Sequence, residues 1–502
     1  MNVPTRRTLW DLVEQRAAAT PERTMLLDER DRRITFGECR ARAERIAAGL
    51  FGVLGIGPGT PVTWQLPTRI ETVLLSLALS RLGALQNPIL PIYREREVAA
   101  LLRLTGARWL VVPRAFRGFD HLALAHALRA AAGESFAVLC ADDGLPEADP
   151  AALPPPPADA SAVRWLYTTS GTTAAPKCAR HTDATLIAGG TGLAVALDAE
   201  EGDVGTIAFP YTHIGGPDYL VMLLLRGMSA VLLESFVPEQ AIAVFRRHGV
   251  TMSGGSTAFY QAFLTEQRKQ PGEKILPTLR LLAGGGAPKP PELFHQVRRE
   301  LGIKVVHGYG MTECPMIANG TPADADEQLA NTDGRPVVGC EVRIVGGEVR
   351  VRGPMLCQGY TDPALTAEAF DADGFFRTGD LGQLRADGHL VLTGRSKELI
   401  LRKGENISPR EIEDLLATHP SVAAVAVIGL PDPERGERVC AVVETRPGAT
   451  PLRFAELQAF CRAAGLMTQK IPEQLELVDA LPRNATLKIL KHELRARFST
   501  RQ

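Results

Sequence analysis

The sequence has 502 residues, of which 45% are hydrophobic and 23% are charged, and its formal net charge is −1. This length exceeds what one hydrophobic core usually supports, so we expect two or more domains, and the lack of a basic surplus argues against nucleic acid as the main partner. The eight cysteines form no C-x-x-C pair, which favours reduced thiols in a cytoplasm over a disulfide framework or a zinc site.

The first hundred residues predict layers of helices and parallel strands. Residues 1–7 lead into a helical pattern with no apolar run, so we expect no signal peptide. Short apolar runs at residues 61–66 and 108–112 then alternate with helical patterns up to about residue 112. This alternation is typical of α/β architecture.

A hydroxyl-rich loop follows a proline-rich connection at residues 151–160. Residues 163–167 read as a short buried strand, and a helix is expected from Asp183 onward. Between them, residues 167–177 (YTTSGTTAAPK) combine Ser and Thr hydroxyls, a glycine and a lysine. Such a loop suits a polyphosphate, although the GxxxxGK[ST] pattern of a Walker loop is absent.

The middle of the chain predicts a second α/β stretch and then a change to β-structure. We expect a strand at residues 228–233 and a helix at residues 238–248. The most apolar stretch, residues 219–233, contains Arg226 and Gly227 and is too short to span a bilayer. After residue 331, segments 341–345 and 348–352 flank Gly346 and Gly347, which indicates a β-hairpin.

The last hundred residues predict a separate small α+β domain. Ser408 to Glu411 (SPRE) reads as a capping box with proline at the first helical position. Strands are expected at residues 424–429 and 438–444, and a terminal helix at residues 488–498. Lys491, in this helix, is expected to be solvated.

Five segments in order give the sequence its family resemblance. The phosphate loop is followed by HGYGMTE at residues 307–313, FRTGD at residues 376–380, TGR with Lys397 at residues 393–397, and PRNATLK at residues 482–488. Together they closely resemble the motifs of the adenylate-forming enzymes, which include acyl-CoA synthetases, luciferases and peptide-synthetase adenylation domains.

The resemblance implies a large N-terminal domain of α/β layers with a β-rich subdomain, residues 1–396, and a small mobile α+β domain, residues 397–502. It implies an acid–CoA ligase that uses ATP and Mg²⁺, forms an acyl-AMP and transfers the acyl group to coenzyme A. The partners are then a small carboxylic acid, ATP and CoA, and the expected assembly is a monomer or homodimer in the cytoplasm.

The resemblance also implies roles for individual residues. The phosphates would be bound by Thr169, Ser170, Gly171, Thr172, Thr173 and Lys177. Adenine and ribose would be bound by Gly284, Gly285, Gly286, Tyr309, Asp380 and Arg395. Catalysis would depend on Thr312 at the α-phosphate, Glu313 as the Mg²⁺ ligand and Lys488 between the substrate carboxylate and the α-phosphate. His213 would border the acyl pocket, Lys397 would be the hinge, and Gly404 would lie beside the CoA channel.

Three residues depart from the family pattern. Ala174, Cys178 and Leu487 stand where glycine is usual, and Leu487 directly precedes the catalytic lysine position. These departures keep open a non-catalytic nucleotide- or acyl-binding protein. Independently of them, an acyl-AMP ligase or an adenylation enzyme that loads a carrier protein stays open as an alternative. Segments 87–97 and 210–216 resemble relatives assigned to alicyclic acids such as cyclohexanecarboxylate. They favour medium-chain, alicyclic or aromatic acids over acetate and palmitate.

Overall fold

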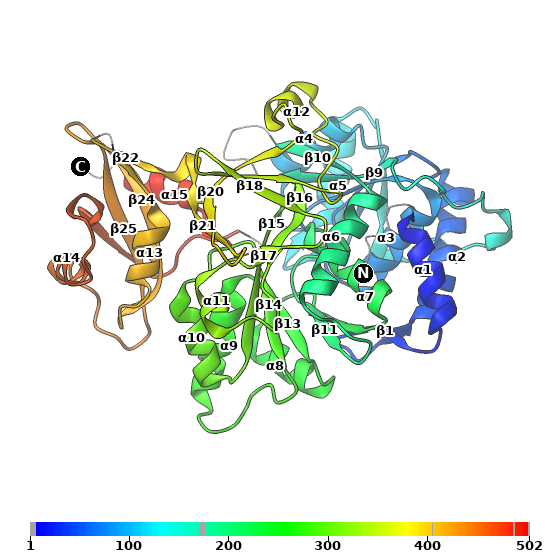
Figure 1. Ribbon diagram of the computed structural model, residues 1–502. Coiled ribbons are helices and arrows are strands. Elements are labelled where there is room, and N and C mark those ends of the chain that lie inside the picture. The colour runs from blue at the N-terminus through cyan, green and yellow to red at the C-terminus, as the bar shows by residue number, and fades with distance from the viewer. Residues whose placement is uncertain (1–6, 170–175, 404, 485–486, 500–502) are drawn as a thin grey trace.

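The computed structural model describes residues 7–169, 176–403, 405–484 and 487–499. It shows a large N-terminal domain and a smaller C-terminal domain, coloured orange to red in Figure 1, beside the yellow β-rich region. The predicted fold class, α/β layers with a β-rich subdomain and a small α+β domain, is confirmed. No helix in the described ranges is long and apolar enough to cross a lipid bilayer.

The first sheet has six strands in the order β10-β9-β4-β3-β5-β8. Their bounds are β3 (Pro61–Trp64), β4 (Leu85–Pro88), β5 (Trp109–Val112), β8 (Ala137–Cys140), β9 (Val163–Thr169) and β10 (Lys177–Thr182). β3, β4, β5 and β8 pair in parallel, as expected. β9 and β10 are antiparallel, so the phosphate-loop segment connects two strands of which the sequence predicts only the first.

A second sheet lies in the same domain, in the order β11-β12-β1-β2. Its strands are β1 (Thr24–Asp28), β2 (Arg33–Thr35), β11 (Val204–Ile207) and β12 (Ser229–Leu232). The helices of this half are α1 (Leu9–Ala19), α2 (Phe36–Leu54), α3 (Ile70–Leu82), α4 (Glu95–Thr105), α5 (His121–Ala131), α6 (Asp183–Ala196) and α7 (Gly215–Arg226). A two-stranded ribbon, β6 (Ala115–Phe116) and β7 (Phe119–Asp120), precedes α5.

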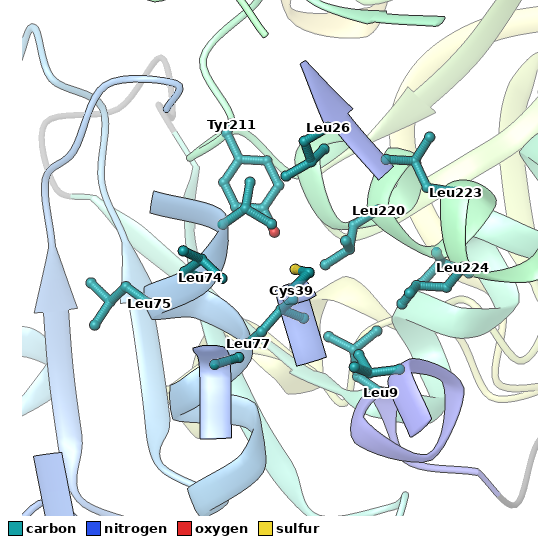
Figure 2. Close-up of a cluster of buried hydrophobic side chains, with 14 of the residues drawn as sticks. Leu9, Leu26, Cys39, Leu74, Leu75, Leu77, Tyr211, Leu220, Leu223 and Leu224 are labelled. Atoms are coloured by element: carbon teal, nitrogen blue, oxygen red, sulfur yellow. The ribbon is translucent and has the colours of Figure 1, made fainter. Parts of the chain in front are cut away.

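The main hydrophobic core lies between these sheets and helices. Figure 2 shows leucines from α1, β1, α3 and α7 meeting around Cys39 and Tyr211. Every residue of α3 except Glu71 is buried, which explains its nearly continuous apolar sequence. Removing one such leucine side chain would cost about 2–5 kcal/mol of stability.

The third sheet has the order β13-β14-β15-β16-β17 and brings the central motifs together. Its strands are β13 (Met252–Gly255), β14 (Leu281–Gly284), β15 (Lys304–Met311), β16 (Cys314–Asn319) and β17 (Arg335–Pro336). The helices of this region are α8 (Pro238–Arg247), α9 (Thr257–Lys269), α10 (Pro291–Glu300) and α11 (Asp326–Asn331).

The β-rich subdomain is an antiparallel sheet in strand order, β18 (Glu341–Val345), β19 (Glu348–Arg352), β20 (Phe376–Leu384) and β21 (Leu390–Arg395), with α12 (Pro363–Ala369). The predicted hairpin is present. Gly346 and Gly347, which connect β18 and β19, have φ angles of 58° and 84°. Positive φ at both central positions is what a tight two-residue turn requires, which explains the glycine pair.

The C-terminal domain has its own five-stranded sheet and core. The strands are β22 (Ile400–Arg402), β23 (Glu405–Ile407), β24 (Val422–Asp432), β25 (Gly436–Thr445) and β26 (Gln474–Val478), and the helices are α13 (Pro409–Leu416), α14 (Phe454–Ala463) and α15 (Lys491–Phe498). β21 ends before the predicted boundary at residues 396/397, and β22 begins after it.

Two local predictions for this domain are wrong in part, although Pro409 begins α13 and a terminal helix is present, as expected. Ser408 precedes α13 but makes no capping hydrogen bond with its side chain. Its hydroxyl donates instead to the Thr393 carbonyl of β21, a competing acceptor from the other domain. The terminal helix begins at Lys491 and not at residue 488, so Lys488 lies in the segment that precedes it.

Candidate active site

A cavity of about 1020 Å³ lies where the two domains meet. We call it the central cavity. Its walls come from the N-terminal domain, from residues 396–398, and from Asn484, residues 487–492 and Arg495. Twelve of the predicted site residues line it: Lys177, His213, Gly284, Gly285, Gly286, Tyr309, Thr312, Glu313, Asp380, Arg395, Lys397 and Lys488. Segments separated by more than 300 residues thus converge on one space.

Several predicted residues cannot be placed around the cavity. Thr169 ends β9. Ser170, Gly171, Thr172, Thr173 and Gly404 lie outside the described residues, as does Ala174. Cys178 is buried in β10, opposite Thr168.

Close backbone contacts explain the glycines of this region. A Cβ atom on Gly285 would lie 2.4 Å from the Gly308 carbonyl oxygen. A Cβ on Gly308 would lie 2.0 Å from Asn319 Oδ1. No side chain fits at these distances. The chain after β14 can therefore lie this close to β15 only because both Gly285 and Gly308 lack a side chain. Thr312 and Glu313 then occupy the turn between β15 and β16.

Tyr309, Asp380 and Arg395 form one polar cluster. The Tyr309 hydroxyl donates to Asp380 Oδ2 at 2.6 Å, and Arg395 Nε lies 2.8 Å from Asp380 Oδ1. Burial and the adjacent Asp380 carboxylate raise the pKa of Tyr309 well above its usual value. Tyr309 therefore stays protonated and holds the carboxylate in place from one side while Arg395 holds it from the other.

Glu313 is a buried carboxylate at the edge of the cavity. Its Oε1 accepts a hydrogen bond from the Tyr360 hydroxyl at 2.6 Å. Burial raises the pKa of Glu313, against the opposing effects of Tyr360 and Lys177. Lys177 Nζ lies 5.4 Å from the centre of the Tyr360 ring.

The Glu313 carboxylate suits a Mg²⁺ ion that is bound together with a polyphosphate. The described residues contain no cluster of three or more metal-binding side chains. A single carboxylate is nevertheless what Mg²⁺ commonly takes from a protein when phosphate oxygens and water supply its other ligands. Glu313 is thus a suitable ligand for such an ion.

His181 supports the same turn and was not predicted from the sequence. Its ring is buried, with Nε2 at 2.8 Å from the Thr312 carbonyl oxygen and Nδ1 at 2.9 Å from Thr185 Oγ1. Burial lowers the pKa of His181 to about 4, so the ring is neutral at pH 7. A neutral imidazole that donates from Nε2 fixes the backbone at Thr312.

Lys488 enters the cavity from the C-terminal domain. Its backbone N–H donates to Asn484 Oδ1 at 2.9 Å, and its side chain is half-buried. Burial and the nearby Arg395 lower the pKa of Lys488 to about 8, although Glu398 and Asp380 act in the opposite direction. Glu398 is paired with Lys491 and Asp380 with Arg395, which leaves the Lys488 ammonium available to an anionic ligand.

The neighbouring Lys491 is not solvated, which corrects the prediction. Its Nζ lies 2.8 Å from Glu413 Oε1 and 3.3 Å from Glu398 Oε2. These two ion pairs raise the pKa of Lys491 despite its burial. Lys491 therefore serves as a fixed structural cation, in contrast to Lys488.

Leu487 shows why glycine is usual at its position. Its φ angle is 62°, in the left-handed region where a residue with a side chain is strained. The Leu487 side chain packs against a core cluster of the N-terminal domain that includes Phe259 and Phe263. The strain is thus accompanied by an apolar contact between the two domains.

His213 lies two residues before the start of α7 and lines the cavity. Its Nδ1 accepts a hydrogen bond from the Gly215 N–H at 3.2 Å. Burial lowers the pKa of His213 to about 4, so the ring is neutral at pH 7.

The chain matches known families and structures over nearly its whole length. The AMP-binding enzyme model matches residues 13–361, and the AMP-binding enzyme C-terminal domain model matches residues 411–488. The chain is 33% identical to the salicyl-AMP ligase / salicyl-S-ArCP synthetase of Mycobacterium tuberculosis, an alignment that covers 97% of this chain and 90% of the relative.

Two further matches agree. The chain is 34% identical to the 2-hydroxy-7-methoxy-5-methyl-1-naphthoate–CoA ligase of Streptomyces carzinostaticus, with 98% of this chain and 93% of the relative covered. Its fold is similar to that of the o-succinylbenzoate coenzyme A synthetase of Bacillus subtilis in complex with ATP and magnesium. The TM-score is 0.84 at 28% identity, with 97% of this chain and 99% of that chain covered.

Proposed function

Because the chain belongs to the AMP-binding enzyme family, and is thus an adenylate-forming ligase, we propose that it is an acid–CoA ligase. A carboxylate oxygen of the acid attacks the α-phosphorus of ATP, and the bond to pyrophosphate breaks. The coenzyme A thiol then attacks the acyl carbonyl of the acyl-AMP, and AMP leaves. The carboxylate is already ionised at neutral pH, so the first step needs no general base.

The convergence of Lys488 with Thr312 and the Tyr309–Asp380–Arg395 cluster carries this proposal. In it, Lys488 lies between the substrate carboxylate and the α-phosphate and offsets their repulsion. Thr312 binds the α-phosphate. Catalysis of this kind depends on positioning and on charge stabilisation.

The remaining groups bind the nucleotide in this proposal. Asp380 accepts hydrogen bonds from the ribose hydroxyls, and Tyr309 stacks on adenine beside the backbone of residues 284–286. Lys177 binds the outer phosphates with residues 169–173. Glu313 holds Mg²⁺, which would neutralise charge on the pyrophosphate leaving group.

The C-terminal domain is proposed to rotate about Lys397 between the two steps. In the present arrangement Lys488 lies in the cavity, which suits adenylation. Thioester formation needs that side open for the thiol, and Gly404 would then border the CoA channel. A change of domain position lets one cavity serve both reactions.

The proposed substrate is a ring-bearing or medium-chain carboxylic acid, with alicyclic acids included. Leu193, Phe209, Tyr219 and Met316 give the cavity an apolar wall. The two relatives above are named for salicyl and naphthoate groups.

The proposed location is a reducing cytoplasm, which suits the eight cysteines because they are buried and form no disulfides.

The second candidate function is transfer of the acyl group to a carrier protein. It is favoured by the 33% identity to a salicyl-S-ArCP synthetase. The experiment that separates the two measures acid-dependent AMP release with and without coenzyme A. A CoA ligase releases AMP continuously only with CoA. A carrier-loading enzyme does not respond to CoA and keeps its acyl-AMP until a carrier is supplied.

A further inference from the structure

Asp218 is a buried acid that no described residue satisfies. It lies in the first turn of α7, is 2% exposed and lines the central cavity. Its Oδ1 atom is fully covered and has no hydrogen-bond partner in the described part of the chain. The other oxygen also has no hydrogen bond or ion pair to a described residue.

Two other buried acids of this domain, Asp183 and Asp203, are partnered, in contrast to Asp218. Asp183, at the start of α6, accepts hydrogen bonds from Leu9 N, Arg164 Nη1 and Trp165 Nε1 at 3.0–3.2 Å. Asp203 is held by Arg280 at 2.7 Å. Neither Asp183 nor Asp203 lines the cavity, whereas Asp218 does.

The fold makes room for the Asp218 carboxyl group. A Cβ atom on Gly189 of α6 would lie 2.7 Å from Asp218 Oδ1, so glycine at that position leaves the space the oxygen occupies. Burial raises the pKa of Asp218 well above its ordinary value. A carboxylate accepts a hydrogen bond from a donor group, and a protonated carboxyl group can in addition donate one.

Structural stability does not explain this residue. A buried polar group without a partner destabilises the fold, and it does so more where no water replaces the hydrogen bond. The dipole of α7 favours a negative charge in the first turn of the helix but supplies no hydrogen bond to the Asp218 carboxyl group. An apolar residue of the same branching, such as leucine, would avoid the cost.

We propose that Asp218 binds a hydrogen-bond-donating substituent, a hydroxyl or an amino group, on the acyl part of the acid substrate. This inference rests on the proposed function, because it assigns a partner within the acyl pocket of that ligase. His213, Tyr219 and Pro315 also line the cavity. The substrate is then an acid with an apolar body and a polar group that faces α7.

The test compares acids that differ only by the substituent. Benzoate and cyclohexanecarboxylate are each paired with their hydroxy and amino derivatives at every ring position, and kcat/KM is measured by pyrophosphate exchange. We expect at least one derivative to exceed its parent by about tenfold or more, since a site built for a donor rejects the analogue that lacks it. The hydroxy and amino arms identify which donor is used.

Two variants assign the preference to the residue. Asp218→Leu should lower the ratio of kcat/KM for the preferred derivative to kcat/KM for its parent acid by about tenfold or more. Asp218→Asn, which keeps size and hydrogen bonding, should retain most of the preference. Asp218→Leu should also unfold at the same or a higher temperature, because an unpaired buried group is removed. Equal loss for parent and derivative, or a wild type indifferent to every substituent, overturns the inference.

Calorimetric binding of the same acid pairs separates this inference from the proposed function. If no acid supports exchange, yet the wild type binds a derivative at least tenfold more tightly than Asp218→Leu does, Asp218 has the assigned role and the ligase proposal is wrong. If exchange proceeds but Asp218→Leu changes no preference, the ligase proposal stands and the role of Asp218 is wrong.

Discussion

Replacing Lys488 by alanine should disable the first half-reaction and spare the second. Lys488 is the cavity lysine with the lowered pKa, about 8, and it reaches the cavity only from the C-terminal domain. Two unit charges about 4 Å apart interact by roughly 4 kcal/mol at an effective dielectric constant near 20. Removal of one preorganised donor of this kind typically costs about 10²–10³ in rate.

The assay follows each half-reaction separately. Adenylation is measured as acid-dependent pyrophosphate exchange, and we expect Lys488→Ala to lose about two to three orders of magnitude. Thioester formation is measured by supplying preformed acyl-AMP and CoA, and it should proceed at nearly the wild-type rate. Lys470→Ala is the control: Lys470 pairs with Glu411 outside the cavity, at 2.6 Å, and its loss should change neither rate.

Equal slowing of both half-reactions by Lys488→Ala would refute the reasoning. It would mean that Lys488 acts throughout the cycle, and that a single static site is a better description than one that exchanges domain positions. Retained exchange activity would refute the placement of the lysine between carboxylate and phosphate.

Three further predictions concern the same site. At pH 9 Lys488 is largely neutral, since its pKa is about 8, so ATP binding should restore its charge and take up about one proton. Calorimetry in buffers of different ionisation enthalpy should detect this proton uptake in the wild type and not in Lys488→Ala. Equal proton uptake by both proteins would contradict the prediction. Leu487→Ala keeps the strained backbone but loses the contact with the N-terminal core, so pyrophosphate exchange should fall several-fold while thioester formation from acyl-AMP is kept. Leu487→Gly relieves about 1–2 kcal/mol of strain and should recover part of the loss. An exchange rate for Leu487→Gly below that of Leu487→Ala would contradict this account. Tyr360→Phe removes the hydrogen bond to Glu313 and should raise the Mg²⁺ concentration for half-maximal exchange by about tenfold, whereas an unchanged Mg²⁺ titration would argue against Glu313 as the ligand.

The sequence predicts the architecture well where the pattern is local or repeated. The apolar runs at residues 61–66 and 108–112 fall on β3 and β5, and the glycine pair at residues 346–347 forms the expected hairpin turn. Motif residues that are adjacent in sequence, such as residues 308–313, also line the cavity as a group. In these cases the backbone geometry follows from neighbouring residues alone.

The predictions fail where a distant element supplies the partner. Ser408 was expected to cap its own helix, but the Thr393 carbonyl competes for its hydroxyl. Lys491 was expected to be solvated, but Glu398 and Glu413 surround it. Such tertiary contacts cannot be predicted from a local sequence pattern.

Single residues without a surrounding motif were missed for the same reason. His181 and Tyr360 support Thr312 and Glu313 from other strands and loops, and nothing in their own neighbourhood marks them. Asp218 is recognisable only by what it lacks, a hydrogen-bond partner among the residues that the structure describes. The glycine departure at Leu487, in contrast, was visible in the sequence, and its φ of 62° supplies the physical reason.

The central claim is that this chain activates a carboxylic acid as an acyl-adenylate. The most direct test is exchange of labelled pyrophosphate into ATP by the purified wild-type protein with Mg²⁺ and a panel of ring-bearing and medium-chain acids, in the absence of any thiol. The account predicts exchange that depends on the acid and that is higher for at least one of these acids than for acetate or palmitate. Exchange that no acid stimulates, in protein that binds ATP, would contradict it.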